Sequence, residues 1–199
     1  MRKEQKANYP ESARGAAALL VRMVLEDGAY TNIALNQYLR GSRLSDLDRR
    51  LATELVYGTV KASGTLDWYL AQCVSRPLDK VAGDILAILR ISTYQLLYMT
   101  RIPASAAVNE AVKLARSVSH EGSAKFVNGV LRGLLRKQEA GAFVLPDAEK
   151  QDADYLSLKY YHPRWLVKRW LGPWGRGGTE RLLAFDNTAA PVCLRANTL

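Results

Sequence analysis

The longest run of helical periodicity in this sequence covers residues 89–136 and restricts that stretch to a helical architecture. Apolar side chains recur there at intervals of three and four residues, which places them on one face of an α-helix. Pro103 stops one helix and serves near the start of the next, and residues 119–123 are predicted to form a turn. Together with Pro77 and the apolar positions from Val81 onwards, the run predicts a long helix that starts at Pro77, a second helix after Pro103, and a third over residues 124–137.

The same spacing continues towards the N-terminus. Ser12 can cap a first helix that ends at Gly28, and further helices are predicted to start at Thr31 and after Ser45. Gly64 is predicted to separate the helix after Ser45 from another. No convincing strand alternation is found before residue 190, so residues 1–138 are predicted to form an all-α bundle of about seven helices with short connections.

Composition changes after this helical region. Residues 139–158 contain Gly141, Pro146 and several acids, and are predicted to be a linker or a short helix. Residues 159–199 are rich in aromatic side chains and are predicted to hold two short helices, separated by a turn at 172–178. Residues 192–197 are the first that can form a strand, and a lone strand cannot satisfy its own backbone groups. We therefore expect an N-terminal fragment of a longer protein, with the truncated start of an α/β region.

The sequence offers no catalytic constellation, so no catalytic, cofactor-binding or metal-ligating residue is predicted. His120 and His162 lack a Cys or carboxylate at metal-ligand spacing, and each is interpreted as a surface or capping group. Cys73 lies in a helical pattern and is interpreted as a core thiol. Two distant cysteines, no apolar run long enough for a membrane span and no signal peptide together predict a cytoplasmic protein.

The net charge of +9 predicts a basic surface that can bind an RNA phosphate backbone. Arginine predominates over lysine in the first part of the chain, and its planar group donates two parallel hydrogen bonds to phosphate. The candidate RNA-binding residues lie in the N-terminal arm, on the first helix and on the helix at 124–137: Arg2, Lys3, Lys6, Arg14, Arg22, Lys125, Arg132 and Arg136. The alternative is that they are solvated, or form ion pairs with Glu11, Glu26 or Glu121.

Several polar residues interrupt the apolar helical pattern. They are expected to hold helices together by hydrogen bonds rather than to form a site. These residues are Tyr94, Gln95, Asn109, Glu110 and Asn128.

Four motifs follow one another within residues 12–137: RLATELVYGTV at 50–60, LRISTYQLLY at 89–98, IPASAAVNEAV at 102–112 and KFVNGVLR at 125–132. Their order and spacing resemble a NusB-like RNA-binding domain. The continuation, YHPRWLVKRW at 161–170 and NTAAPVCLRAN at 187–197, resembles the RsmB (Sun, Fmu) family of 16S rRNA cytosine-C5 methyltransferases.

This resemblance implies an all-helical fold that binds small-subunit ribosomal RNA. In the full-length protein it implies methyl transfer from S-adenosylmethionine to C5 of a cytosine, after a catalytic cysteine attacks C6. The family's catalytic cysteines and cofactor motif lie beyond residue 199, and Cys193 is not one of them. The expected partners are ribosomal RNA and the protein's own C-terminal methyltransferase domain, with no metal and no membrane.

Two alternatives remain open at this point. A stand-alone NusB-like antitermination factor should end near residue 140, which the additional residues argue against. A helical module that docks on its own catalytic domain without binding RNA is compatible with the same motifs.

Overall fold

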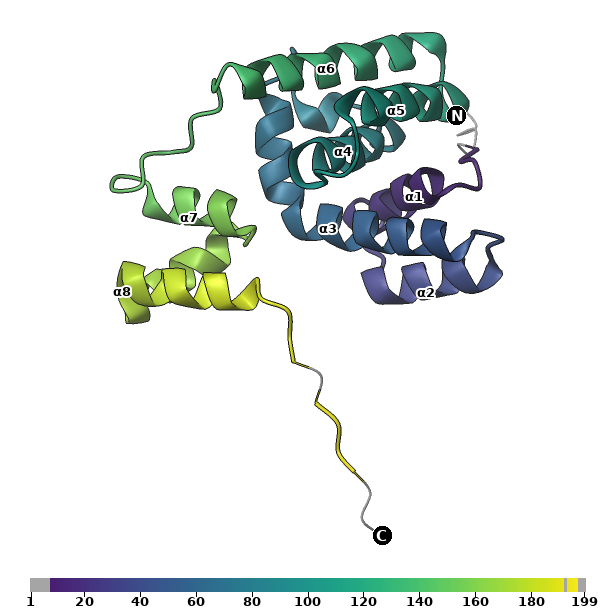
Figure 1. Cartoon of the computed structure of the whole chain (residues 1–199). Coiled ribbons are helices and arrows are strands. Elements are labelled where there is room, and N and C mark those ends of the chain that lie inside the picture. The colour runs from purple at the N-terminus through teal and green to yellow at the C-terminus, as the bar shows by residue number, and fades with distance from the viewer. Residues whose placement is uncertain (1–7, 192, 197–199) are drawn as a thin grey trace. The chain divides into compact units, whose positions relative to one another are not determined.

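A computed structural model of the chain describes residues 8–191 and 193–196, and these residues contain helices and no strand (Figure 1). The all-α prediction is confirmed. The α-helices are α1 (Ala13–Leu25), α2 (Thr31–Gly41), α3 (Asp46–Ala71), α4 (Gly83–Tyr98), α5 (Ala104–Val118), α6 (Glu121–Glu139), α7 (Asp152–Tyr160) and α8 (Arg164–Asp186), with a 3-10 turn, η1, at Leu78–Lys80. The chain divides into two compact units, Met1–Val144 and Leu145–Leu199.

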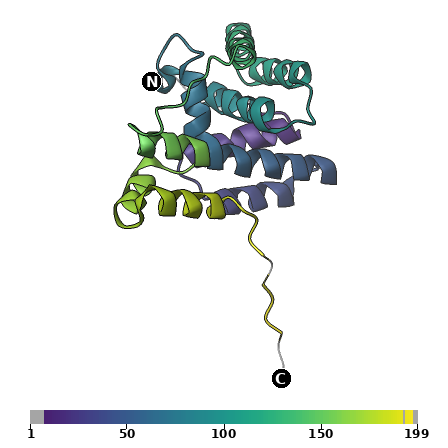
Figure 2. The same cartoon turned by 60° about the vertical axis from the view of Figure 1, so that its left-hand side comes forward.

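Helix α4 forms the centre of the first unit. It packs against α1, α3, α5 and α6, and both Figure 1 and Figure 2 show it between the α5–α6 layer and α1 with α3. The aliphatic side chains of residues 85–91 are buried all around the helix, and Ile88, Leu89 and Ile91 are among the largest fully buried ones. Full burial of such a side chain is worth about 1.5–3 kcal/mol. This packing explains why the apolar residues of α4 surround the helix rather than occupying one stripe.

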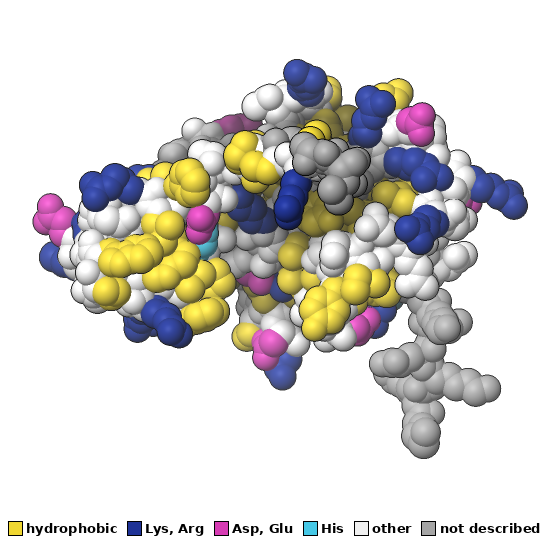
Figure 3. Space-filling view, turned by 90° about the horizontal axis from the view of Figure 1, so that it is seen from below, with side chains coloured by type: hydrophobic (Ala, Val, Ile, Leu, Met, Phe, Trp, Pro, Cys, Tyr) yellow, Lys and Arg dark blue, Asp and Glu magenta, His cyan; other side chains and the backbone are white. Residues whose placement is uncertain are grey.

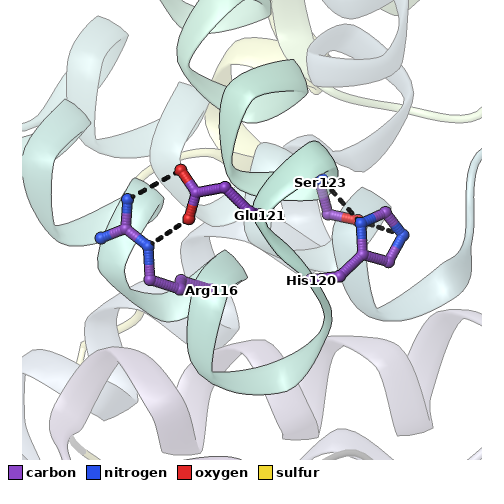
Figure 4. A network of polar contacts seen from close by, with 4 residues as sticks. All are labelled: Arg116, His120, Glu121 and Ser123. Atoms are coloured by element: carbon purple, nitrogen blue, oxygen red, sulfur yellow. Dashed lines mark hydrogen bonds and ion pairs between the residues drawn. The ribbon is translucent and has the colours of Figure 1, made fainter.

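Side chains at the N-terminal caps define where three helices begin. Ser12 Oγ accepts a hydrogen bond from Gly15 N–H at 3.1 Å, and Ser45 Oγ accepts one from Asp48 N–H at 3.2 Å. The third cap is His120, whose Nδ1 accepts from Ser123 N–H at 3.3 Å (Figure 4). The predicted caps of α1 and α3 are confirmed, as is a capping role for His120.

Three predicted boundaries in this unit were wrong. Gly64 does not break a helix, because α3 runs through it and buries Ala62 and Leu66 on either side; packing outweighs the cost of about 1 kcal/mol for a helical glycine. Pro77 opens only η1, and α4 begins at Gly83. The turn predicted at residues 119–123 is shorter, because the His120 cap lets α6 begin at Glu121.

The second unit is a helix pair with a small core. Ala153 and Leu156 of α7 pack with Val167 and Leu183 of α8. Glu180 Oε1 accepts hydrogen bonds from Lys159 Nζ and the Tyr160 hydroxyl, each at 2.9 Å. Both hydrogen bonds lower the pKa of Glu180, and the one from Lys159 has the larger effect.

The predicted turn at 172–178 and the predicted strand both need correction. The turn narrows to Gly175, whose φ of 60° and ψ of 179° interrupt α8. Residues 188–191 and 193–196 form neither helix nor strand. The physical reason is the absence of a neighbouring strand among the described residues, since an isolated strand has no partner for its backbone groups. Val192 and Asn197, at the ends of the predicted strand, lie outside the described residues.

We predict that Gly15→Ala lowers the free energy of unfolding by about 1–3 kcal/mol, because overpacking strains the backbone. A Cβ at Gly15 would lie 2.1 Å from the carbonyl oxygen of Pro10. Gly64→Ala is the matched control, since a Cβ there meets nothing within 4 Å and should stabilise α3 by about 0.5–1 kcal/mol. Urea denaturation followed by circular dichroism measures both, and equal shifts in the two variants would contradict the argument.

We also predict that His120→Ala destabilises the protein by about 1 kcal/mol, because the first turn of α6 loses its side-chain acceptor. His120→Asn restores an acceptor at the cap and should recover most of the loss in thermal unfolding. If the two variants melt together, the imidazole does not act as the cap.

Candidate nucleic-acid interface

The two candidate arginines of α1 are engaged inside the first unit. Arg14 Nε donates to Gln95 Oε1 at 2.8 Å, and Gln95 of α4 is only 1% exposed. Arg22 Nε lies 3.3 Å from Asp84 Oδ1 and 3.9 Å from Glu26 Oε2. For Arg22, the predicted alternative of an ion pair with Glu26 is what the structure shows. Both arginines therefore fasten α1 to α4 and have limited freedom to contact phosphate.

The polar cluster around Asp84 extends this attachment. The Tyr9 hydroxyl donates to Asp84 Oδ1 at 2.6 Å, and burial together with that carboxylate raises the pKa of Tyr9. Burial also raises the pKa of Glu26, although the charges of Arg90 and Arg22 oppose the shift. The charged side chains of this cluster therefore interact mainly with one another.

The three candidate cations of α6 have a different environment. Lys125, Arg132 and Arg136 are exposed, and spacings of seven and four residues place them on one face of the helix. Arg132 Nε donates to Asn128 Oδ1 at 3.0 Å within the same helix. Within residues 8–191 and 193–196, Lys125 and Arg136 have no ion pair within 4.0 Å and no side-chain hydrogen bond. Their charges are available to a ligand.

A groove between α5 and α6 collects two of these cations. It has a volume of about 490 Å³, and Ser105, Val108 and Asn109 line it opposite Arg132, Leu135 and Arg136. Glu139 also lines it. The groove combines an apolar floor, two guanidinium groups and a primary amide, and such mixed concave sites are typical of ligand pockets.

Two of the carboxylates on α5 and α6, Glu110 and Glu121, are already paired. Arg116 binds Glu121 through two hydrogen bonds of 2.7 and 3.1 Å (Figure 4). Lys113 Nζ lies 2.8 Å from Glu110 Oε1. These hydrogen bonds lower the pKa values of Glu121 and Glu110. Glu121 is thus paired with Arg116, and no candidate RNA-binding residue among the described residues forms an ion pair with it, although the charge of Lys125 also lowers its pKa.

Basic side chains are not confined to α6. Figure 3 shows Lys and Arg spread over the opposite, lower face of the chain as well. Charge alone therefore does not locate a site, whereas unpaired cations beside a groove do.

The polar residues expected at helix junctions behave in three ways. Gln95 links α4 to α1, and the Tyr94 ring packs so closely on α3 that a Cβ at Gly58 would lie 2.1 Å from its Cζ. Glu110 and Asn128 bond within their own helices. Asn109 is exposed in the groove, and its amide has no hydrogen bond to any described residue. Sequence reasoning missed Asn109 and Ser105 as groove residues, although their four-residue spacing puts them on one helix face.

Arg2, Lys3 and Lys6 lie outside the described residues. No group of three or more His, Cys, Asp or Glu residues that could hold a metal ion occurs in the part of the chain that the structure describes. None of its described helices has the length and apolar character needed to cross a membrane.

Comparison with known protein families agrees with both the sequence motifs and the helical fold. Residues 11–136 match the NusB family. The chain belongs to the NusB family. Residues 162–199 also match the ferredoxin-like domain of the Methyltr_RsmF/B-like family, so a NusB family domain is followed here by a match to a second domain.

The curated relatives are longer proteins with a methyltransferase name. The chain is 40% identical over 188 residues to the probable ribosomal RNA small subunit methyltransferase B of Synechocystis, which covers 94% of this chain and 41% of the relative. It is 34% identical over 188 residues to the probable protein of the same name from Bacillus subtilis, with the same coverage. The chain thus spans about two fifths of the length of these relatives.

Solved structures show the same fold at low sequence identity. NusB of T. maritima superposes with a TM-score of 0.59 at 21% identity, covering 67% of this chain and 98% of that chain. A chain of the complex of antitermination factors NusB and NusE with dsRNA gives a TM-score of 0.58 at 21% identity, covering 64% of this chain and 96% of that one. The NusB-like bundle is therefore shown.

The different environments of the arginines predict different effects on stability. Arg14→Met should lower the free energy of unfolding by about 1–3 kcal/mol, because the buried Gln95 carbonyl loses its donor. Arg136→Met should change it by less than about 0.5 kcal/mol, as is usual for an exposed substitution. Urea titration of the two variants tests this, and a larger loss for Arg136→Met would contradict the assignment.

Proposed function

We propose that the NusB-like unit binds small-subunit (16S) ribosomal RNA through the face of α6 that carries Lys125, Arg132 and Arg136. In the longer protein this unit would position the RNA for methyl transfer to C5 of a cytosine. The observation that carries the proposal is the presence of unpaired, exposed cations beside the α5–α6 groove. Arginine suits this role because its planar group binds phosphate through two parallel hydrogen bonds.

The comparisons support the RNA class of ligand. One similar fold was determined in a complex of NusB and NusE with dsRNA, and the relatives are named as small-subunit rRNA methyltransferases. The match of residues 162–199 to an RsmF/B-like domain favours a methyltransferase over a stand-alone antitermination factor.

The methyl donor would be S-adenosylmethionine, and the described residues do not fit its binding. They are helical throughout their regular structure, with no strand that leads into a glycine-rich loop and helix. We therefore assign neither cofactor binding nor a chemical step to this chain. In the proposal, cofactor binding and the chemical step belong to a C-terminal methyltransferase domain of the longer protein. This chain would contact that domain as its partner.

The test measures RNA binding by the 199-residue chain as a function of salt. Fluorescence anisotropy with labelled fragments of small-subunit rRNA should give a linear fall of log K with log salt, by about 0.7 per phosphate contact for single strands and 0.9 for duplexes. Arg132→Ala combined with Arg136→Ala should reduce the slope by roughly 1.4–1.8, because two contacts are lost. Lys125→Ala should remove one further contact.

Arg40→Ala is the matched control, since Arg40 is exposed on α2 and has no ion pair among the described residues. It should leave the slope unchanged. Binding that is absent at low salt, or that is the same in the double variant, would refute the proposal and favour a helical module that docks on its own catalytic domain without RNA.

A further inference from the structure

We infer that the groove between α5 and α6 receives one unstacked adenine of a single-stranded RNA, and that Asn109 selects this base. The inference rests on the RNA binding proposed above and adds a source of sequence preference to it. It concerns Asn109, an exposed residue of α5 that lines the groove.

The first argument is that the Asn109 amide has no other partner. It stands on α5 at the groove, exposed, and makes no hydrogen bond to any residue among those described. Asn128 and Gln95, by contrast, accept hydrogen bonds from Arg132 and Arg14. A primary amide offers an acceptor and two donors on one planar group. That set can pair with adenine, which presents a donor at N6 and an acceptor at N7.

The second argument is the shape and chemistry of the groove. Its volume of about 490 Å³ lies in the usual range of roughly 300–1,000 Å³ for small-molecule pockets. Val108 and Leu135 give it an apolar floor on which a planar base can lie. Proteins that read RNA sequence contact unstacked bases in this way, through stacking and hydrogen bonds to base edges.

The third argument is the charge around the same groove. Arg132 and Arg136 stand opposite Asn109, and Glu139 leaves the lining with one net positive charge. The first turn of α5 adds amide groups, because Pro103 at its N-cap offers no side-chain acceptor. A nucleotide whose base enters the groove would thus meet cations and free N–H groups near its phosphates.

The experiment compares 8-nucleotide homopolymers of A, C and U, titrated into the 199-residue chain by fluorescence anisotropy. The wild type should prefer the A oligomer. Asn109→Ala should reduce the preference for A over C by roughly tenfold, while the salt slope stays unchanged because no charge is altered. Asn109→Asp keeps an acceptor for N6 but loses the donor to N7, so it should shift the preference towards C, whose N4 is a donor.

Two controls separate this inference from the proposed function. Asn36→Asp adds the same negative charge at an exposed position of α2 and should leave the base preference intact. Lys125→Ala, at an exposed position of α6 that does not line the groove, should weaken all three oligomers equally and lower the salt slope by about 0.7.

The possible failures are distinguishable. A wild type that binds all oligomers alike, or an Asn109→Ala variant that retains the preference, would overturn the role of Asn109 even if Lys125→Ala lowers the salt slope. Loss of all RNA binding at low salt would refute the proposed function itself. Because Asn109 is exposed, its variants should fold normally, and their thermal unfolding provides the check.

Discussion

Burial of α4 is the constraint on which the rest of the first unit depends. Most polar side chains of this largely buried helix have partners inside the protein, because an unpaired buried group costs about 1–3 kcal/mol; the Thr93 hydroxyl is an exception among the described residues. Gln95 accepts a hydrogen bond from Arg14, and Asp84 forms an ion pair with Arg22. Arg90 donates two hydrogen bonds of 2.8 Å to Asp67 of α3. These contacts fasten α1 and α3 to the centre of the unit.

This arrangement divides the cations into two groups. Arg14 and Arg22 of α1 bind side chains of α4. By contrast, Lys125, Arg132 and Arg136 of α6 are exposed at the surface. The acidic neighbours Glu110 and Glu121 are paired with Lys113 and Arg116. Two of these exposed cations, Arg132 and Arg136, line the groove between α5 and α6, which also supplies an apolar floor and an amide.

Local signals in the sequence predicted much of the fold. Ser12, Ser45 and Pro103 mark the starts of α1, α3 and α5 as expected, because caps and prolines act within one helical turn. Gly64 misled, since buried neighbours on both sides keep α3 continuous. The strand predicted at residues 192–197 requires a partner strand, and the described residues offer none. Errors thus arose where long-range contacts outweigh local preference.

The sequence by itself determined the helical class and the NusB family, because periodicity and linked motifs are properties of neighbouring residues. It also showed an excess of basic groups, but Arg14 and Arg136 look alike along the chain. Only the tertiary structure decided which of them is free. Arg14 faces the buried Gln95, while Arg136 stands at an open groove beside Asn109. Pairing depends on which groups meet across helices, and helix periodicity does not specify that.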